Sequence, residues 1–116
     1  MDSKVLEFVN GVNGQLYLYK DKVILGCKGF NAKVNKGLFQ KDIEIPIRDL
    51  EEVNGKLATV INKGYVEFRP SFYEKSKIKI SKDQDPYVIT FTKRHFREEN
   101  NPKVERILDY IKNYKK

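Results

Sequence analysis

Apolar and polar side chains alternate along most of this chain, in short segments separated by turn-forming residues. Such alternation is typical of half-buried strands that are joined by hairpins. The pattern predicts strands over 5–9, 15–20, 22–27, 42–47, 57–61, 65–69, 76–82 and 87–92. We therefore expect a mainly β, antiparallel structure of about seven to nine strands.

The expected hairpin turns depend on asparagine and glycine, which tolerate the positive φ angles of tight turns. These turns are expected at Asn13-Gly14, Asn54-Gly55 and Asn62-Lys63-Gly64. Pro46 cannot donate a hydrogen bond to a neighbouring strand, so we expect it at a sheet edge or a strand end. Pro70 is expected to end the strand over 65–69.

The C-terminal part of the chain has a helical period instead. Apolar side chains recur at helical spacing at Val104, Ile107, Leu108, Ile111 and Tyr114. Asn101 is expected to cap the helix, with Pro102 at the first helical position. We expect one helix over about 102–114, which packs its apolar stripe against the sheet.

The length of 116 residues fits a single domain, 1–116. An apolar share of 40% and an aromatic share of 12% exceed what disordered chains contain, so we expect a folded, soluble protein. No apolar stretch approaches the roughly eighteen residues that a transmembrane segment needs. Cys27 is the single cysteine, which excludes an internal disulfide and favours a reducing cytoplasm.

Three strings within this pattern resemble a known family. They are Asn13-Gly14-Gln15-Leu16-Tyr17-Leu18-Tyr19-Lys20-Asp21-Lys22-Val23-Ile24, Lys28-Gly29-Phe30 and Gly64-Tyr65-Val66-Glu67-Phe68. With the strands and the closing helix, they resemble the bacterial pleckstrin-homology-like (PH-like) domains of unknown function, over nearly the whole chain. The resemblance implies an antiparallel β-barrel or sandwich capped by one C-terminal α-helix. Many such domains continue into a helical SHOCT tail, which this sequence lacks.

The sequence offers no residue pattern for catalysis, a cofactor or a metal. His95 and Cys27 are the only histidine and cysteine, too few for a zinc site. Cys27 is expected on the buried face of its strand, where a thiol is inert. Neither glycine-rich nucleotide motif occurs. The acids, including Asp83 and Asp85, fall in turns or on exposed strand faces and are expected to be solvated. We expect a non-enzyme.

Residues 28–41 are the strongest candidate binding segment, with four lysines, two glycines and no acid. The candidate partner-binding residues are Lys28, Phe30, Lys33, Lys36, Phe39 and Lys41. Loops commonly carry function, and exposed aromatic residues are typical interface anchors. The alternative is that the phenylalanines fill the core and the lysines are merely solvated.

A net charge of +7, from 23 basic and 16 acidic residues, permits binding to polyanions but also simply favours solubility. A second group of lysines is expected to face outward and to protect a strand edge from aggregation: Lys75, Lys77, Lys79 and Lys82. The basic, arginine-containing first hairpin of lipid-binding PH domains is absent from 17–24, which argues against phosphoinositide binding.

Two functions remain open at this point. The first is a cytoplasmic adaptor that binds a protein partner, or copies of itself, through an exposed strand edge and the segment 28–41. The second is a polyanion binder, for nucleic acid or an anionic phospholipid surface. The lysine- and asparagine-rich composition is typical of a low-GC bacterium or its phage, so a phage-encoded inhibitor of a host protein is a variant of the first function.

Overall fold

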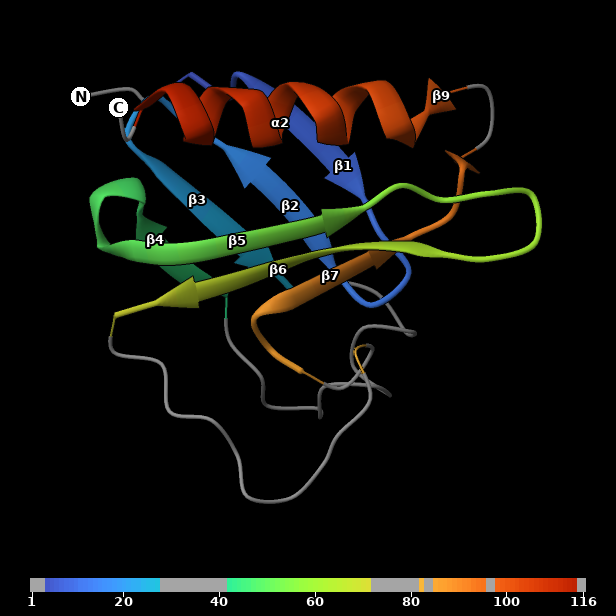
Figure 1. The fold of residues 1–116 in the computed structure, drawn as a ribbon, viewed down its shortest axis with the longest axis horizontal. Coiled ribbons are helices and arrows are strands. Elements are labelled where there is room, and N and C mark those ends of the chain that lie inside the picture. The colour runs from blue at the N-terminus through green and yellow to red at the C-terminus, as the bar shows by residue number, and fades with distance from the viewer. Residues whose placement is uncertain (1–3, 28–41, 72–81, 83–84, 96–97, 115–116) are drawn as a thin grey trace.

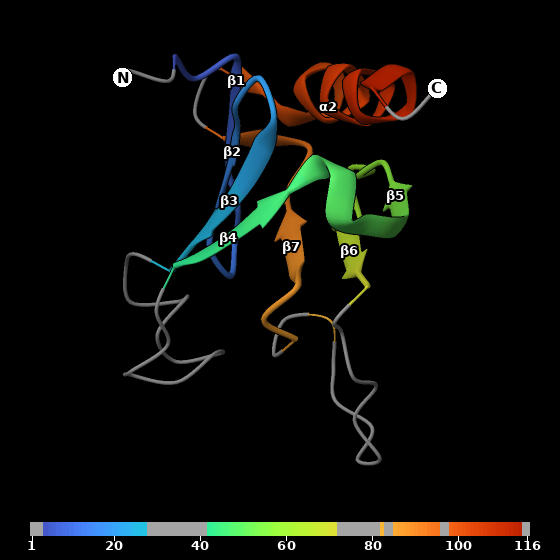
Figure 2. The same ribbon diagram turned by 90° about the vertical axis from the view of Figure 1, so that its left-hand side faces the viewer.

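The structure is a computed structural model that describes residues 4–27, 42–71, 82, 85–95 and 98–114. Two antiparallel sheets, of four and three strands, face each other across a hydrophobic core. The C-terminal helix lies across one open end of the space between them (Figures 1 and 2). The expected mainly β class and closing helix are confirmed. Over the described residues the two sheets do not join into a closed barrel, so the architecture is sandwich-like.

The first sheet consists of four consecutive strands in the order β1 (Glu7–Asn10), β2 (Gln15–Leu18), β3 (Lys22–Gly26) and β4 (Ile43–Pro46). The hairpins predicted around Asn13-Gly14 and before Lys22 are confirmed. In the second of these, the Tyr19 amide donates a hydrogen bond to the Lys22 carbonyl at 2.8 Å. Pro46 lies at the end of the edge strand β4, as expected.

The second sheet has the order β5 (Leu50–Lys56), β6 (Gly64–Pro70) and β7 (Val88–Phe91). A 3-10 turn, Ile47–Asp49, redirects the chain from β4 into β5. A short ribbon of β8 (Arg94–His95) and β9 (Glu98–Glu99) leads into the helix. The expected strands near 65–69 and 87–92 are confirmed, and β6 ends at Pro70. The strand expected over 76–82 lies outside the described residues except for Lys82.

Two predictions around β5 are wrong. Asn54 and Gly55 do not form a turn but lie within β5, and residues 57–61 form the β5–β6 loop rather than a strand. A Cβ atom at Gly55 would lie 2.6 Å from Leu108 Cδ1, so this glycine allows the helix to approach the strand. Glycine inside a strand often marks such a close approach.

The helix α2 (Asn100–Tyr114) begins two residues before the predicted start. Asn101 does not cap it. Instead, the Asn101 side chain accepts a hydrogen bond from the Ala58 amide and donates one to the Ala58 carbonyl, both at 2.9 Å. Asn101 is thus used in a long-range contact that ties the β5–β6 loop to the start of the helix.

The core lies between the two sheets and beneath the helix. Its fully buried large side chains come from both sheets and from α2, and include Leu16, Leu25, Ile45, Phe68, Phe91 and Ile107. From the predicted helical stripe, Val104, Ile107 and Ile111 are buried, Leu108 is partly buried and Tyr114 is 42% exposed. Cys27 is buried as expected, next to the end of β3.

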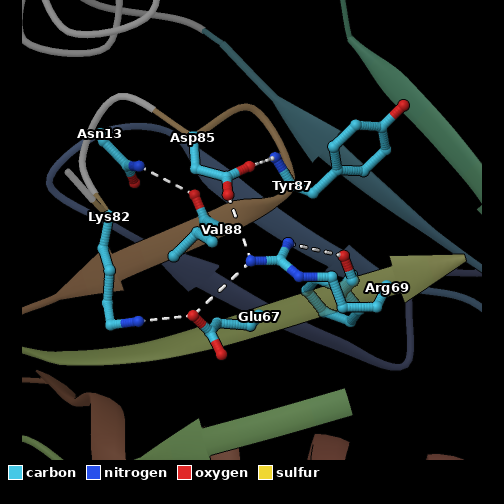
Figure 3. Close-up of polar contacts among 8 residues, drawn as sticks. Asn13, Glu67, Arg69, Lys82, Asp85, Tyr87 and Val88 are labelled. Carbon is cyan, nitrogen blue, oxygen red and sulfur yellow. Dashed lines mark hydrogen bonds and ion pairs between the residues drawn. The ribbon is translucent and has the colours of Figure 1, made fainter. Parts of the chain in front are cut away.

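The turn between β1 and β2 connects the two sheets. The Val12 amide donates to the Thr90 carbonyl at 2.7 Å. The fully buried Asn13 side chain accepts from the Thr90 amide at 2.9 Å and donates to the Val88 carbonyl at 2.8 Å, a bond drawn in Figure 3. Asn13 and Val12 therefore take the place of a neighbouring strand along the outer edge of β7.

We predict that Asn13→Ala destabilises the fold by about 2–5 kcal/mol, because two buried backbone groups of β7 lose their hydrogen-bond partner. Chemical denaturation measures this as a lower unfolding midpoint. Asn54→Ala, at an exposed position of β5, is the control and is expected to change stability by about 0.5 kcal/mol at most. Equal midpoints for the two variants would contradict the role of Asn13.

The packing of α2 leads to a second prediction. Ile111→Ala should lower the free energy of unfolding by about 2–5 kcal/mol, the usual range for truncating a buried aliphatic side chain. The neighbouring exposed residue provides the control, since Lys112→Ala removes a side chain without leaving a cavity. If both variants unfold at the same denaturant concentration, the helix is not packed on the core.

Candidate functional site

All six candidate partner-binding residues belong to 28–41, which lies outside the described residues. Lys75, Lys77 and Lys79 also lie outside them. The described part of the chain presents two other features with clustered polar or apolar groups, and neither was expected: an ion-pair cluster on β6 and a groove between β5 and α2.

The ion-pair cluster lies where β6 meets the connection to β7 (Figure 3). Arg69 Nη2 is 3.2 Å from Asp85 Oδ2 and 3.7 Å from Glu67 Oε2. The same oxygen, Glu67 Oε2, accepts a hydrogen bond from Lys82 Nζ, and this ammonium group lies 4.3 Å from the centre of the Tyr65 ring. Each carboxylate of this cluster therefore has a cationic partner.

Asp85 was expected to be solvated, and this is wrong, because the residue is only 6% exposed. Its Oδ1 accepts a hydrogen bond from the Tyr87 amide at 2.9 Å, and its carbonyl accepts one from the Val88 amide. Asp85 thus orders the turn that leads into β7, and Arg69 neutralises its charge. The arrangement holds this turn in place and leaves neither carboxylate unpaired for proton transfer.

A groove runs between β5 and α2, with a volume of about 340 Å³. In Figure 1 the two elements lie one below the other. Its lining combines apolar side chains with charged ones: Leu50, Glu51, Glu52, Val53, Gly55, Leu108, Asp109, Ile111 and Lys112. The volume lies within the range of ligand sites, and the apolar floor with a charged rim is the usual composition of a recognition surface.

The backbone of β5 borders this groove with hydrogen-bonding groups that point away from β6 and are not paired with another described strand. Phe68 of β6 donates its amide to the Tyr87 carbonyl, so its backbone groups point toward β7. In an antiparallel pair, the residue opposite such a position points its own groups outward. Val53 lies opposite Phe68, and Gly55 opposite Val66, so both present an N–H and a C=O to the free edge.

The other sheet edges among the described residues are less accessible to a partner. The edge of β7 is occupied by Val12 and Asn13. The edge strand β1 is tied to α2, where Arg106 Nε donates to Glu7 Oε2 at 2.7 Å. The edge strand β4 has four residues and ends in Pro46, features that protect an edge from pairing. In the described part of the chain, β5 is the longest edge strand, and a groove lies beside it.

Sequence reasoning missed this groove because its two walls are far apart in the chain. One signal was present but was interpreted as a hairpin turn: Asn54-Gly55 contains a glycine, which can also mark a bulge or a close backbone approach. The groove arises from that approach, since Leu108 sits against Gly55.

No group of three or more His, Cys, Asp or Glu side chains that could hold a metal ion occurs among the described residues. Within the same residues, no helix is long and apolar enough to cross a membrane. Comparisons of this chain with models of known protein families, with curated proteins and with solved structures found no match.

We predict that Arg69→Ala lowers the free energy of unfolding by about 1–3 kcal/mol, because Asp85 is left buried without its cation. Arg48→Ala is the control. Arg48 is highly exposed, and its guanidinium lies 4.0 Å from Asp49, so its loss should change stability by about 0.5 kcal/mol or less. Thermal or chemical denaturation that gives equal stability for the two variants would contradict the structural role of the cluster.

Proposed function

We propose that this protein is a non-catalytic binding module of PH-like fold, an adaptor that binds an extended segment of a protein partner along the free edge of β5. The observation that carries the proposal is the coincidence of two features. Val53 and Gly55 direct backbone hydrogen-bonding groups outward, and the groove beside them is lined by Leu108 and Ile111 of α2.

This arrangement suits strand addition, in which an extended peptide pairs with the free edge of a sheet as a further strand. The backbone of an incoming segment bonds to the strand edge and supplies affinity, while pockets beside the strand accept alternate side chains and supply specificity. Here the helix forms the second wall, so side chains on one face of the segment would reach Leu108 and Ile111. The remaining side chains would face solvent and the charged rim.

The charges around the groove indicate which segment fits. Glu51, Glu52 and Asp109 line it, and Lys112 is the single basic residue among the lining side chains. This local excess of acid contrasts with the net charge of +7 of the whole chain. Complementary charge favours the correct partner and rejects like-charged ones. The segment should therefore combine aliphatic with lysine or arginine side chains.

The order of the elements supports the PH-like part of the proposal. Four strands form one sheet, the next three form a second sheet, and a helix follows them at the C-terminal end. This agrees with the expectation drawn from the resemblance of residues 13–24 and 64–68. The single cysteine, which is buried, is compatible with a role in the cytoplasm.

Selection from a displayed random-peptide library tests the binding function. We expect enriched peptides without proline that alternate aliphatic residues with lysine or arginine. In NMR titrations, these peptides should shift the amide signals of Val53 and Gly55 and of the α2 residues from Leu108 to Lys112. Peptides that bind but shift signals elsewhere, or a library that yields no binder, would contradict the proposal.

Charge reversal provides the matched variants. Glu52→Lys with Asp109→Lys changes two exposed groove residues and should weaken binding of a selected peptide about tenfold or more. Asp21→Lys with Glu105→Lys makes the same change in net charge at exposed positions that do not line the groove. Equal affinities of the two double variants would contradict recognition of a basic segment at the groove.

A further inference from the structure

The β5–β6 loop exposes two adjacent aliphatic side chains to an unusual degree. Val60 is 87% exposed and Ile61 is 90% exposed. Single exposed apolar residues are common on protein surfaces, but these two are neighbours at the tip of a loop that projects from the side of the molecule (Figure 1). Burying both side chains in an apolar environment would remove a substantial apolar surface from water.

The loop is built to hold this tip in place. The Thr59 amide donates to the Asn62 carbonyl at 2.8 Å, and Thr59 Oγ1 accepts from the Asn62 amide at 2.9 Å. At its base, Asn101 holds both backbone groups of Ala58. A Cβ atom at Gly64 would lie 2.3 Å from the Lys56 carbonyl oxygen, so the loop closes tightly. Val60 and Ile61 therefore lie in an ordered turn that holds both side chains exposed.

Cationic side chains flank the tip. A hollow of about 240 Å³ beside it is lined by the loop and by the segment after β7: Thr59, Val60, Ile61, Asn62, Lys63, Thr92, Lys93 and Arg94. Three of these residues are basic and none is acidic. The two contributing stretches, 57–66 and 86–97, contain no acidic residue. Arg94 is 3.0 Å from Glu99, and its side chain remains 60% exposed.

We propose that the β5–β6 loop docks this protein on an anionic phospholipid surface. Val60 and Ile61 enter the boundary between headgroups and acyl chains, while Lys63, Lys93 and Arg94 contact the phosphates. A projecting apolar tip fits a deformable bilayer better than a flat protein surface, and basic residues add attraction to anionic lipids. The tip lies beyond the end of β5 and shares no lining residue with the groove, so this inference is independent of peptide binding.

Tryptophan fluorescence tests insertion directly, since the chain contains no tryptophan. Ile61→Trp should shift its emission to shorter wavelength when vesicles of phosphatidylcholine with phosphatidylglycerol are added. Vesicles of phosphatidylcholine alone should leave it unchanged. Leu6→Trp, at another exposed aliphatic position, is the control and should not respond. Unchanged emission of Ile61→Trp, or an equal shift in Leu6→Trp, would overturn the proposal.

Vesicle sedimentation tests the energetic role of the tip. Val60→Ser with Ile61→Ser should weaken binding to the anionic vesicles about tenfold or more, whereas Val5→Ser with Leu6→Ser should leave it unchanged. Lys63→Gln with Lys93→Gln should weaken binding more than Lys4→Gln with Lys20→Gln, which removes the same charge elsewhere. Raising the salt concentration should also weaken it.

Three sedimentation results would also overturn the docking role. The first is wild-type protein that does not sediment with anionic vesicles at low ionic strength, which would leave the tip to a protein partner. The second is equal binding by the two double serine variants, which would mean that the tip does not enter the bilayer. The third is equal binding by the two lysine pairs, because net charge alone would then explain the attraction.

Discussion

The packing of the two sheets against each other depends on the buried side-chain amide of Asn13. The edge of β7 that faces away from β6 would leave the Val88 carbonyl and the Thr90 amide without partners, and an unpaired polar group in a dry interior is costly. Asn13 supplies an acceptor and a donor at once, and Val12 adds a third bond. A turn of the first sheet thereby completes the second sheet, and the two layers are held at the spacing that the core fills.

The docking of the β1–β2 turn on β7 bears on where a partner segment could pair with the second sheet. The β1–β2 turn covers the edge of β7, so among the described residues the uncovered edge of the second sheet is the opposite one, at β5. The helix then lies beside that edge instead of covering it, at a separation set by Leu108 against Gly55. The groove thus results from the same packing that stabilises the core. Ile111 of α2 is buried and also borders the groove.

For binding, the local distribution of charge over the surface matters more than the net charge of the chain. A net charge of +7 suggests a uniformly basic protein, yet the groove at β5 has an acidic rim, and the projecting loop carries cations beside an apolar tip. Electrostatic attraction between exposed groups acts over about 10 Å at moderate ionic strength, so each surface responds to its local charges. Two surfaces of opposite character are what the two proposed roles require, since a basic segment would bind at the first and an anionic surface at the second.

The sequence by itself determined the class of fold, the hairpins of the first sheet, the ends of strands at Pro46 and Pro70, and the helix with its buried stripe. These features follow from local periodicity and from the restricted backbone of proline, which operate within a few residues. Only the tertiary structure decided the roles of glycine and asparagine residues that suit more than one kind of local structure. Glycine and asparagine suit turns and caps, but the same properties serve long-range contacts, as Gly55 and Asn101 demonstrate. The groove could not be predicted, because its walls come from distant segments and because the place of β5 at the edge of its sheet is set by the tertiary arrangement.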